Sequence, residues 1–148
     1  MKFLSGEKVK NFMEDIICEK KQVHKHCVDL TVKKIYRLRS GASLDFGGSE
    51  YKAADKKPLK PVKTGKEDKY GWWKLTPGSY IFRYNELLTL APGQKAVIQM
   101  HPRVSESGVC HTSCIKEESG EILMHVIVAD ETCLKENARV SEVRIMEE

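Results

Sequence analysis

An arginine and two serines stand close together in the segment "HPRVSESG", residues 101–108. The planar guanidinium of Arg103 has the shape that recognises phosphate oxygens, and Ser105 adds a hydroxyl nearby. Glu106 follows at once and would repel a polyanion. The segment is therefore either a turn that binds phosphate groups or a polar turn between two strands, and its residues alone do not decide between them.

Cysteine and histidine gather in two other segments, "HKHC" at 24–27 and "CHTSC" at 110–114. If the two segments met in space, four of these side chains could bind zinc. On one strand, however, Cys110 and Cys114 would lie about 13 Å apart, which is too far to share an ion. The alternative is free thiols in a reducing compartment, which the odd number of five cysteines favours. The candidate zinc ligands are His24, His26, Cys27, Cys110, His111 and Cys114.

The size and composition of the chain predict one globular domain over residues 1–148. No apolar run approaches the roughly 20 residues that cross a bilayer, and the first residues lack the features of a secretion signal. We therefore expect a cytoplasmic protein with no membrane partner. The net charge of +4 comes from the lysine-rich segment 52–69, which is predicted to be an exposed, mobile loop. Without a broader basic surface, we expect no nucleic-acid partner.

Apolar residues with helical spacing follow Ser5, whose hydroxyl can cap the first turn of a helix. Lys20 and Lys21 suit the end of such a helix, because positive charge is favourable there. The segment 5–21 is therefore predicted to form one helix. Its apolar stripe consists of Val9, Phe12, Met13, Ile16 and Ile17.

The rest of the chain consists of short segments rich in β-branched and apolar residues, separated by turns such as Pro77-Gly78 and Pro92-Gly93. One helix followed by about eight short strands predicts a mainly β fold, a distorted barrel or sandwich. The continuous apolar run in 119–130 predicts a strand that is buried on both faces. The other predicted strands are 27–38, three strands between 71 and 100, and 137–146.

Adjacent tryptophans, Trp72 and Trp73, open the central group of strands. Neighbouring residues of a strand face opposite sides. We therefore expect one of the two rings to pack in the core while the other covers an interface or a ligand.

Taken in chain order, these segments resemble the dUTPase and dCTP deaminase superfamily. "LSGEKVKNFM" is similar to the deaminase's N-terminal helix, and "VDL" is similar to the first motif. "LTPGSYIFRYNELLTLAPG" resembles the passage "L-x-PGEF-x-L-x-x-T-x-E-x-(V/I)-x-(I/L)-P", and "NARVSEV" resembles "GxRIAQL". The resemblance covers nearly the whole chain. It implies a β-clip fold, a homotrimer with sites between subunits, and a deoxynucleoside triphosphate that carries Mg²⁺.

The resemblance also assigns binding residues. "RVSESG" stands where the family has an arginine followed by two serines, so Arg103 and Ser105 would hold the triphosphate, while Val104 replaces one serine. Asp29 matches the aspartate of the first motif, with an exposed or capping carboxylate as the alternative. Arg139 matches the arginine of "GxRIAQL".

The catalytic positions depart from the family. "CIKEESG" stands where the family has the pattern "(V/I)-I-D-P-G-(F/Y/W)-x-G". Lys116 occupies the position of the aspartate that the resemblance identifies as the general base of dUTPases. Glu117 or Glu118 could take over as the base, or could lie in a solvated turn. The catalytic glutamate of the deaminases falls on His125, which could act as a base or be a core residue. No glycine-rich fifth motif follows, so hydrolysis by the family's route is expected to be weak.

The leading hypothesis is a dUTPase/dCTP-deaminase-like protein that binds a deoxynucleoside triphosphate, with weak hydrolysis releasing diphosphate or weak deamination. The alternative is a non-catalytic trimeric β-domain with an interaction or regulatory role. A small zinc-binding module is the third hypothesis. No dedicated metal-binding residues are predicted for the first two.

Overall fold

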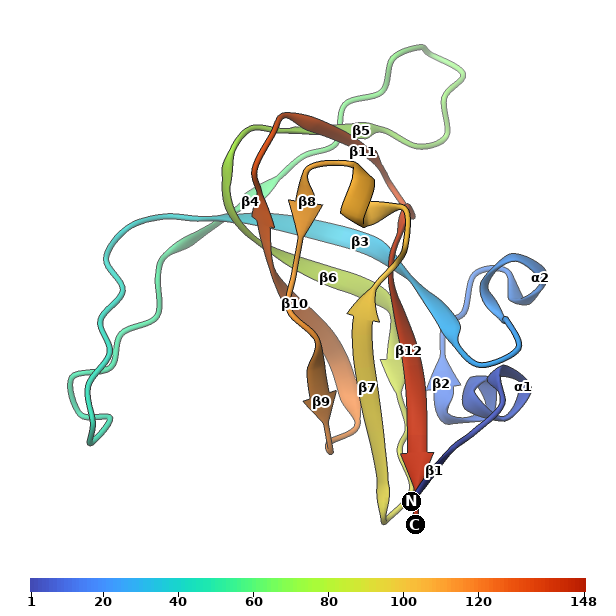
Figure 1. Ribbon diagram of the computed structural model, residues 1–148. Coiled ribbons are helices and arrows are strands. Elements are labelled where there is room, and N and C mark those ends of the chain that lie inside the picture. Colours follow the sequence, from blue (N-terminus) through green and yellow to red (C-terminus); the bar gives the residue numbers. More distant parts are fainter.

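Ten strands form one strongly curled antiparallel sheet in the computed structural model, which describes all 148 residues (Figure 1). Seven of them follow the order β8-β10-β6-β3-β12-β7-β9, while β1, β2 and β4 pair with β12, β6 and β3. Two further strands, β5 and β11, form a separate ribbon over one end. The mainly β fold predicted from the sequence is confirmed. The strands are β1 (Lys2–Phe3), β2 (Met13–Glu14), β3 (Val28–Leu38), β4 (Lys56–Leu59), β5 (Trp72–Leu75), β6 (Gly78–Leu88), β7 (Gln94–Met100), β8 (Val109–Cys110), β9 (Cys114–Lys116), β10 (Gly120–Val128), β11 (Thr132–Lys135) and β12 (Arg139–Glu147).

The strand β3 lies at the centre of the sheet, because it pairs with β12, β6 and β4. Its sequence "VDLTVKKIYRL" is rich in β-branched and apolar residues, which fit a pleated, buried surface. The first five residues of β3 are all buried. In β6 burial alternates strictly, as expected for side chains that point in turn to the two faces. This alternation turns Tyr80, Phe82, Tyr84, Glu86 and Leu88 toward the core.

The predicted helix over 5–21 is wrong as a continuous element. The helix α1 (Gly6–Val9) passes into the 3-10 turn η1 (Lys10–Phe12), the strand β2 follows, and a separate helix α2 spans Glu19–Gln22. Met13 and Glu14 pair with the end of β6, and Asp15 then takes a positive φ of 63°. Pairing with a distant strand therefore replaces the later helical turns. The apolar stripe still serves the core in part, since Val9 and Met13 are buried.

The lysine-rich segment 52–69 is largely exposed, as predicted, but it also contains the strand β4. The backbone of β4 pairs with the second half of β3, from Ile35 to Leu38. Leu59 at its end packs against the core, and the ring nitrogen of Trp73 donates to its carbonyl oxygen at 3.0 Å. Trp73 is buried whereas Trp72 is 38% exposed, so the predicted division between the two rings is confirmed for the core residue.

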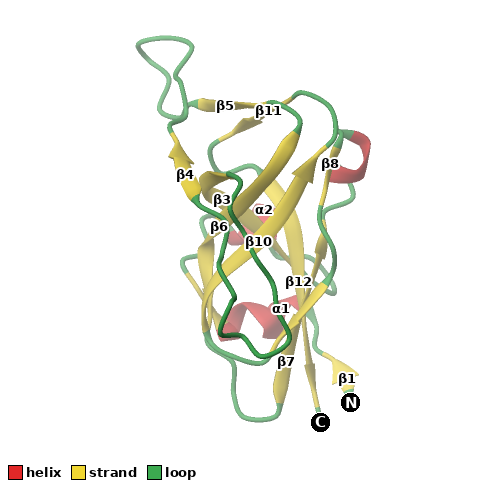
Figure 2. Cartoon of the chain, turned by 90° about the vertical axis from the view of Figure 1, so that its left-hand side faces the viewer, coloured by secondary structure: helices red, strands yellow, loops and turns green.

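The strand β10 forms as predicted, but it is buried on one face only. Ile122, Met124 and Val126 face the core, whereas Leu123 and Ile127 face outward and are 42% and 38% exposed. The continuous apolar run was therefore misleading, because the outer face is covered only in part, by residues between 42 and 54. Figure 2 shows this segment passing in front of β10.

The core is one cluster of 25 buried apolar residues enclosed by the curled sheet. The helices α1 and α2 have four residues each, and none of the helices reaches the length and hydropathy that a membrane crossing requires. Both lie beside the start of β3, which they help to cover (Figure 1).

Candidate functional site

A buried carboxylate, Asp29, lies at the start of β3 and is only 1% exposed. Its Oδ2 accepts a hydrogen bond from Arg139 Nη1 at 3.2 Å and lies 2.8 Å from His24 Nε2. His101 Nε2 approaches the same oxygen at 3.6 Å, beyond hydrogen-bond distance. The structure thus brings together Asp29 and Arg139, two residues assigned by resemblance. The alternative of an exposed or capping Asp29 is wrong.

Arg139 links α2 (Glu19–Gln22) to the sheet. Arg139 Nη1 also donates to the carbonyl oxygen of Lys21 at 3.0 Å, which leaves Nη2 and Nε of Arg139 without partners in the chain. Burial lowers the pKa of His101, although the charge of Asp29 acts in the opposite direction. His101 is therefore mainly neutral at pH 7, and Arg139 provides a permanent positive charge beside Asp29.

A second buried carboxylate, Glu86, positions the segment that carries Asp29. Glu86 Oε2 accepts a hydrogen bond from Thr31 N at 2.9 Å, and Oε1 accepts from Thr31 Oγ1 at 2.5 Å and from Gln22 Nε2 at 2.7 Å. Gln22 Nε2 also donates to the carbonyl oxygen of Asp29 at 2.9 Å. Burial raises the pKa of Glu86, and these hydrogen bonds oppose the shift. Glu86 was not predicted from the sequence; its signal is a charged residue in the inward register of β6.

The predicted phosphate-binding turn is the 3-10 turn η2 (Val104–Glu106), which follows β7. Val104 is buried and anchors the turn, while Arg103 and Ser105 are exposed. Ser105 Oγ donates to the carbonyl oxygen of Pro102 at 2.8 Å, and Arg103 N donates to His101 Nδ1 at 3.2 Å. The guanidinium of Arg103 has no hydrogen-bond or ion-pair partner in the chain.

Two hollows meet at Arg139. The first, of about 150 Å³, is lined by Arg103 and Arg139 together with β8, β11 and β12 residues. The second, of about 330 Å³, is lined by Arg139 and by Lys21, Tyr70 and Asn137. We call this arrangement the Arg139 site. It comprises Arg103 and Arg139, which line the first hollow, Asp29, which is bonded to Arg139, and Lys21 and Tyr70, which line the second hollow.

The predicted catalytic residues lie elsewhere in the chain. Glu117 and Glu118 follow β9 and are exposed, and Glu117 forms an ion pair with Lys95 at 2.5 Å. This ion pair sits at the start of β7, whereas η2 follows its other end, so the two are separated by about 20 Å. His125 is on the outer, partly covered face of β10 and is exposed, so the expectation of a core histidine is wrong. A single chain does not unite these residues with Arg103, and their catalytic roles stay predictions.

The predicted zinc ligands do not come together. Cys110 is exposed, and His111 is buried, with Nε2 2.7 Å from Ser141 Oγ and Nδ1 2.9 Å from the carbonyl oxygen of Thr112. Burial lowers the pKa of His111 and raises that of Cys114. A different group, Cys27, Asp29 and Glu142, has ligand atoms that all lie within 4.8 Å of one another. All five cysteines are free.

Comparisons with known proteins agree with this architecture. No family model matches the chain. A Methanosarcina mazei protein named probable deoxyuridine 5'-triphosphate nucleotidohydrolase is 24% identical over 135 residues, which cover 88% of this chain and 75% of that protein. The structure of 2'-deoxycytidine 5'-triphosphate deaminase from Agrobacterium tumefaciens superposes with a TM-score of 0.65 over 99% of this chain, at 15% identity. The chain has the fold of the dUTPase and dCTP deaminase superfamily.

The resemblance predicted from the sequence is thereby confirmed. The chain spans about half of the deaminase, 48% of its length. The activity and partners of the deaminase do not transfer with the fold, because they belong to the whole deaminase protein.

Proposed function

We propose that this dUTPase/dCTP-deaminase-like protein binds a deoxynucleoside triphosphate at the Arg139 site and turns it over weakly or not at all. The observation that carries the proposal is the pair of arginines around one hollow. Arg103 presents a guanidinium with no partner in the chain, and Arg139 uses only Nη1 for its bonds within the chain. Charge-assisted hydrogen bonds from guanidinium groups to phosphate oxygens are among the strongest hydrogen bonds that side chains make.

The second hollow supplies groups of the kind that a nucleoside needs. Tyr70 offers an aromatic ring at its rim, and Lys21 and Asn137 add polar groups beside it. An aromatic face can stack on any base, which supports binding without fixing which base is preferred. Mg²⁺ would enter with the triphosphate, held by phosphate oxygens and water.

Weak turnover is part of the proposal because the predicted catalytic side chains are far from the arginines within one chain. Glu117 forms an ion pair with Lys95, and His125 lies on the outer face of β10. In the homotrimer that the resemblance implies, a neighbouring copy could bring one of these residues to the Arg139 site. Light scattering coupled to size-exclusion chromatography will test the trimer directly.

Thermal unfolding with Mg²⁺ and an excess of dUTP, dCTP, dTTP or ATP tests the proposal. A ligand at about 100 times its Kd adds about 2.7 kcal/mol, which for a chain of this size raises Tm by about 5–10 °C. Arg103→Ala should remove the shift, whereas Arg39→Ala, which changes an exposed arginine of the 39–55 segment, should keep it. Chromatography of the same samples will detect a monophosphate or a deaminated product.

The absence of a shift with all four nucleotides would contradict nucleotide binding, as would an unchanged shift in Arg103→Ala. The alternative, a non-catalytic trimeric β-domain, is favoured by exposed apolar side chains on and near the outer face of β10. Leu44 and Phe46 are almost fully exposed, Leu123 and Ile127 are partly exposed, and Leu44 lines the same hollow as Leu123. A trimer without a nucleotide-induced shift would support this alternative.

A further inference from the structure

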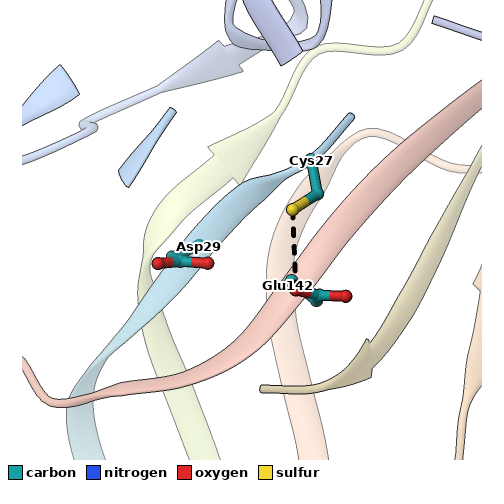
Figure 3. A group of neighbouring side chains, drawn as sticks. All are labelled: Cys27, Asp29 and Glu142. Atoms are coloured by element: carbon teal, nitrogen blue, oxygen red, sulfur yellow. Dashed lines mark hydrogen bonds between the residues drawn. The ribbon is translucent and has the colours of Figure 1, made fainter. Parts of the chain in front are cut away.

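Three side chains of types that bind metals in other proteins converge at the edge of the Arg139 site, with which they share Asp29. Cys27 directly precedes β3, and Asp29 is two residues further on, so both face the same side of the strand. Glu142 on β12 is the register partner of Asp29 and shares that side. Their ligand atoms all lie within 4.8 Å of one another. Figure 3 shows the thiol of Cys27 pointing at the carboxylate of Glu142, with Asp29 beside them.

These side chains are largely removed from solvent. Asp29 is 1% exposed, Cys27 is 6% exposed, and the side chain of Glu142 is 15% exposed. Cys27 Sγ donates to Glu142 Oε2 at 3.5 Å. Whereas Asp29 Oδ2 contacts His24 and Arg139, Asp29 Oδ1 is buried and has no hydrogen-bond partner. A buried acceptor without a partner costs about 1–3 kcal/mol, so this oxygen requires an explanation.

We propose that Cys27, Asp29 and Glu142 bind a thiophilic divalent cation, with Zn²⁺ as the expected ion. A cation between the three side chains would supply the partner that Asp29 Oδ1 lacks. It would bind Cys27 as the thiolate and release to solvent the thiol proton that Cys27 now donates to Glu142. A thiolate among the ligands selects zinc-like ions over Mg²⁺ and Ca²⁺, which prefer all-oxygen sites. This set differs from the zinc ligands predicted from the sequence and shares only Cys27 with them.

To bind zinc, the ligand atoms of the three side chains must move slightly closer together. Zinc bonds of about 2.0–2.3 Å in a tetrahedron place neighbouring ligand atoms about 3.5 Å apart. The separation between Cys27 Sγ and Glu142 Oε2 already has this value, 3.5 Å, and the other separations within the 4.8 Å group can shorten by side-chain rotation. Three protein ligands leave one position open to water or to a bound molecule, as in catalytic zinc sites.

Neighbouring residues hold the two carboxylates in place, as residues around a metal site hold its ligands. His24 and Arg139 hold the second oxygen of Asp29, and Arg144 Nη2 lies 3.3 Å from Glu142 Oε1. Such contacts orient metal ligands and balance their charge. His24 and His101 do not belong to the group of mutually close ligand atoms, so they are not proposed as ligands.

The test uses the full chain and the metal alone. The protein is stripped with a chelator, exchanged into metal-free buffer and titrated with Zn²⁺, and bound metal is measured by mass spectrometry. We expect one ion per chain. Cys27→Ser should lower the affinity by more than the about 10- to 100-fold that loss of an outer partner costs. Cys110→Ser, which changes an exposed thiol on β8, should leave it unchanged.

Co²⁺ provides a readout that needs no variant, because a cobalt–thiolate bond gives an intense charge-transfer absorption. Its appearance in the unmodified protein, and its loss in Glu142→Gln or Cys27→Ser, would support the site. Failure to retain Zn²⁺, absence of the cobalt–thiolate band, or binding that persists in Cys27→Ser but disappears in Cys110→Ser would overturn it. If Cys27→Ser does not fold, Glu142→Gln and the cobalt spectrum decide. Nucleotide is absent throughout, so these results stand apart from the nucleotide-binding proposal.

Discussion

Gly6 is a position where the addition of one methyl group should destabilise the protein strongly. It lies at the start of α1, packed against the 24–27 segment, and its backbone N–H donates to the carbonyl oxygen of Lys25 at 3.0 Å. A Cβ at Gly6 would lie 1.8 Å from the carbonyl oxygen of His24 and 2.8 Å from that of Cys27. Both of these atoms belong to the backbone, so no side-chain rotation can relieve the contacts.

The magnitude of the Gly6→Ala change follows from these distances. Real Cβ contacts are not found below 3.0 Å, so α1 or the 24–27 segment must move by at least about 1.2 Å. Overpacking of this kind costs about 1–3 kcal/mol, and the rigid backbone on both sides places Gly6→Ala at the upper end of that range. The displaced segment carries His24 and Cys27, so the surroundings of Asp29 should change as well.

Urea unfolding followed by circular dichroism measures this cost. With a slope of about 2 kcal/mol/M, a loss of about 3 kcal/mol lowers the midpoint by about 1.5 M urea. The matched control is Gly47→Ala, because Gly47 is exposed and a Cβ there meets no atom within 4 Å. We expect the control to change stability by no more than about 0.5 kcal/mol. Equal midpoints for Gly6→Ala and Gly47→Ala would refute the packing of α1 described above.

The adjacent tryptophans provide a second pair of variants: Trp73→Ala should lose about 3–5 kcal/mol, because it empties a core position and leaves the carbonyl oxygen of Leu59 without its donor. Trp72→Ala, at the half-exposed ring, should lose less than half as much in the same urea assay, and equal losses would contradict the assigned faces. The third prediction concerns pH. Because burial lowers the pKa of His111 below its ordinary value near 6.5, the stability due to its neutral form is present above that pH and is lost as pH falls toward the lowered pKa. This contributes at most about 1.4 kcal/mol per pH unit, and urea unfolding from about pH 7.5 to about pH 5.5 should show a shallower decline for His111→Gln than for the unmodified protein. A decline of the same slope in both proteins would show that His111 is not the group responsible.

Local sequence patterns were sufficient for the central strands and insufficient at the N-terminus. The strand β3 was predicted from its β-branched composition, and β6 lies in the predicted group of three strands between 71 and 100. The 5–21 segment has a helical stripe, yet β2 pairs with the end of β6 and ends the helix. This pairing joins residues far apart in the chain, and no local pattern records it. The exposure of His125 could not be predicted for a similar reason. The burial of an apolar strand depends on which distant segment covers its second face.

The candidate site was only partly predictable. Asp29 and Arg139 were named through the family resemblance, and they do meet. Glu142 was not identified, although it is the register partner of Asp29, because cross-strand register is set by the whole sheet. Glu86 could have been found from the alternation of β6, where a charge falls among inward-facing residues. The gathering of cysteine and histidine suggested a zinc site that includes Cys27, but the other predicted ligands do not come together, and the ligand atoms that lie within 4.8 Å of Cys27 Sγ belong to Asp29 and Glu142.

The pairing of β12 with β3 also bears on how the chain acquires its structure. The central strand β3 pairs along one edge with β12, which lies near the other end of the chain. The strand β1 also pairs with β12, with Lys2 opposite Glu147. Contacts between residues so distant in sequence require large loops to close before they stabilise anything. We therefore expect slow refolding, in milliseconds to seconds, as is typical of sheets dominated by non-local pairing. Asp29 meets Arg139 and Glu142 only when β12 docks on β3, so the site cannot form before this long-range pairing does.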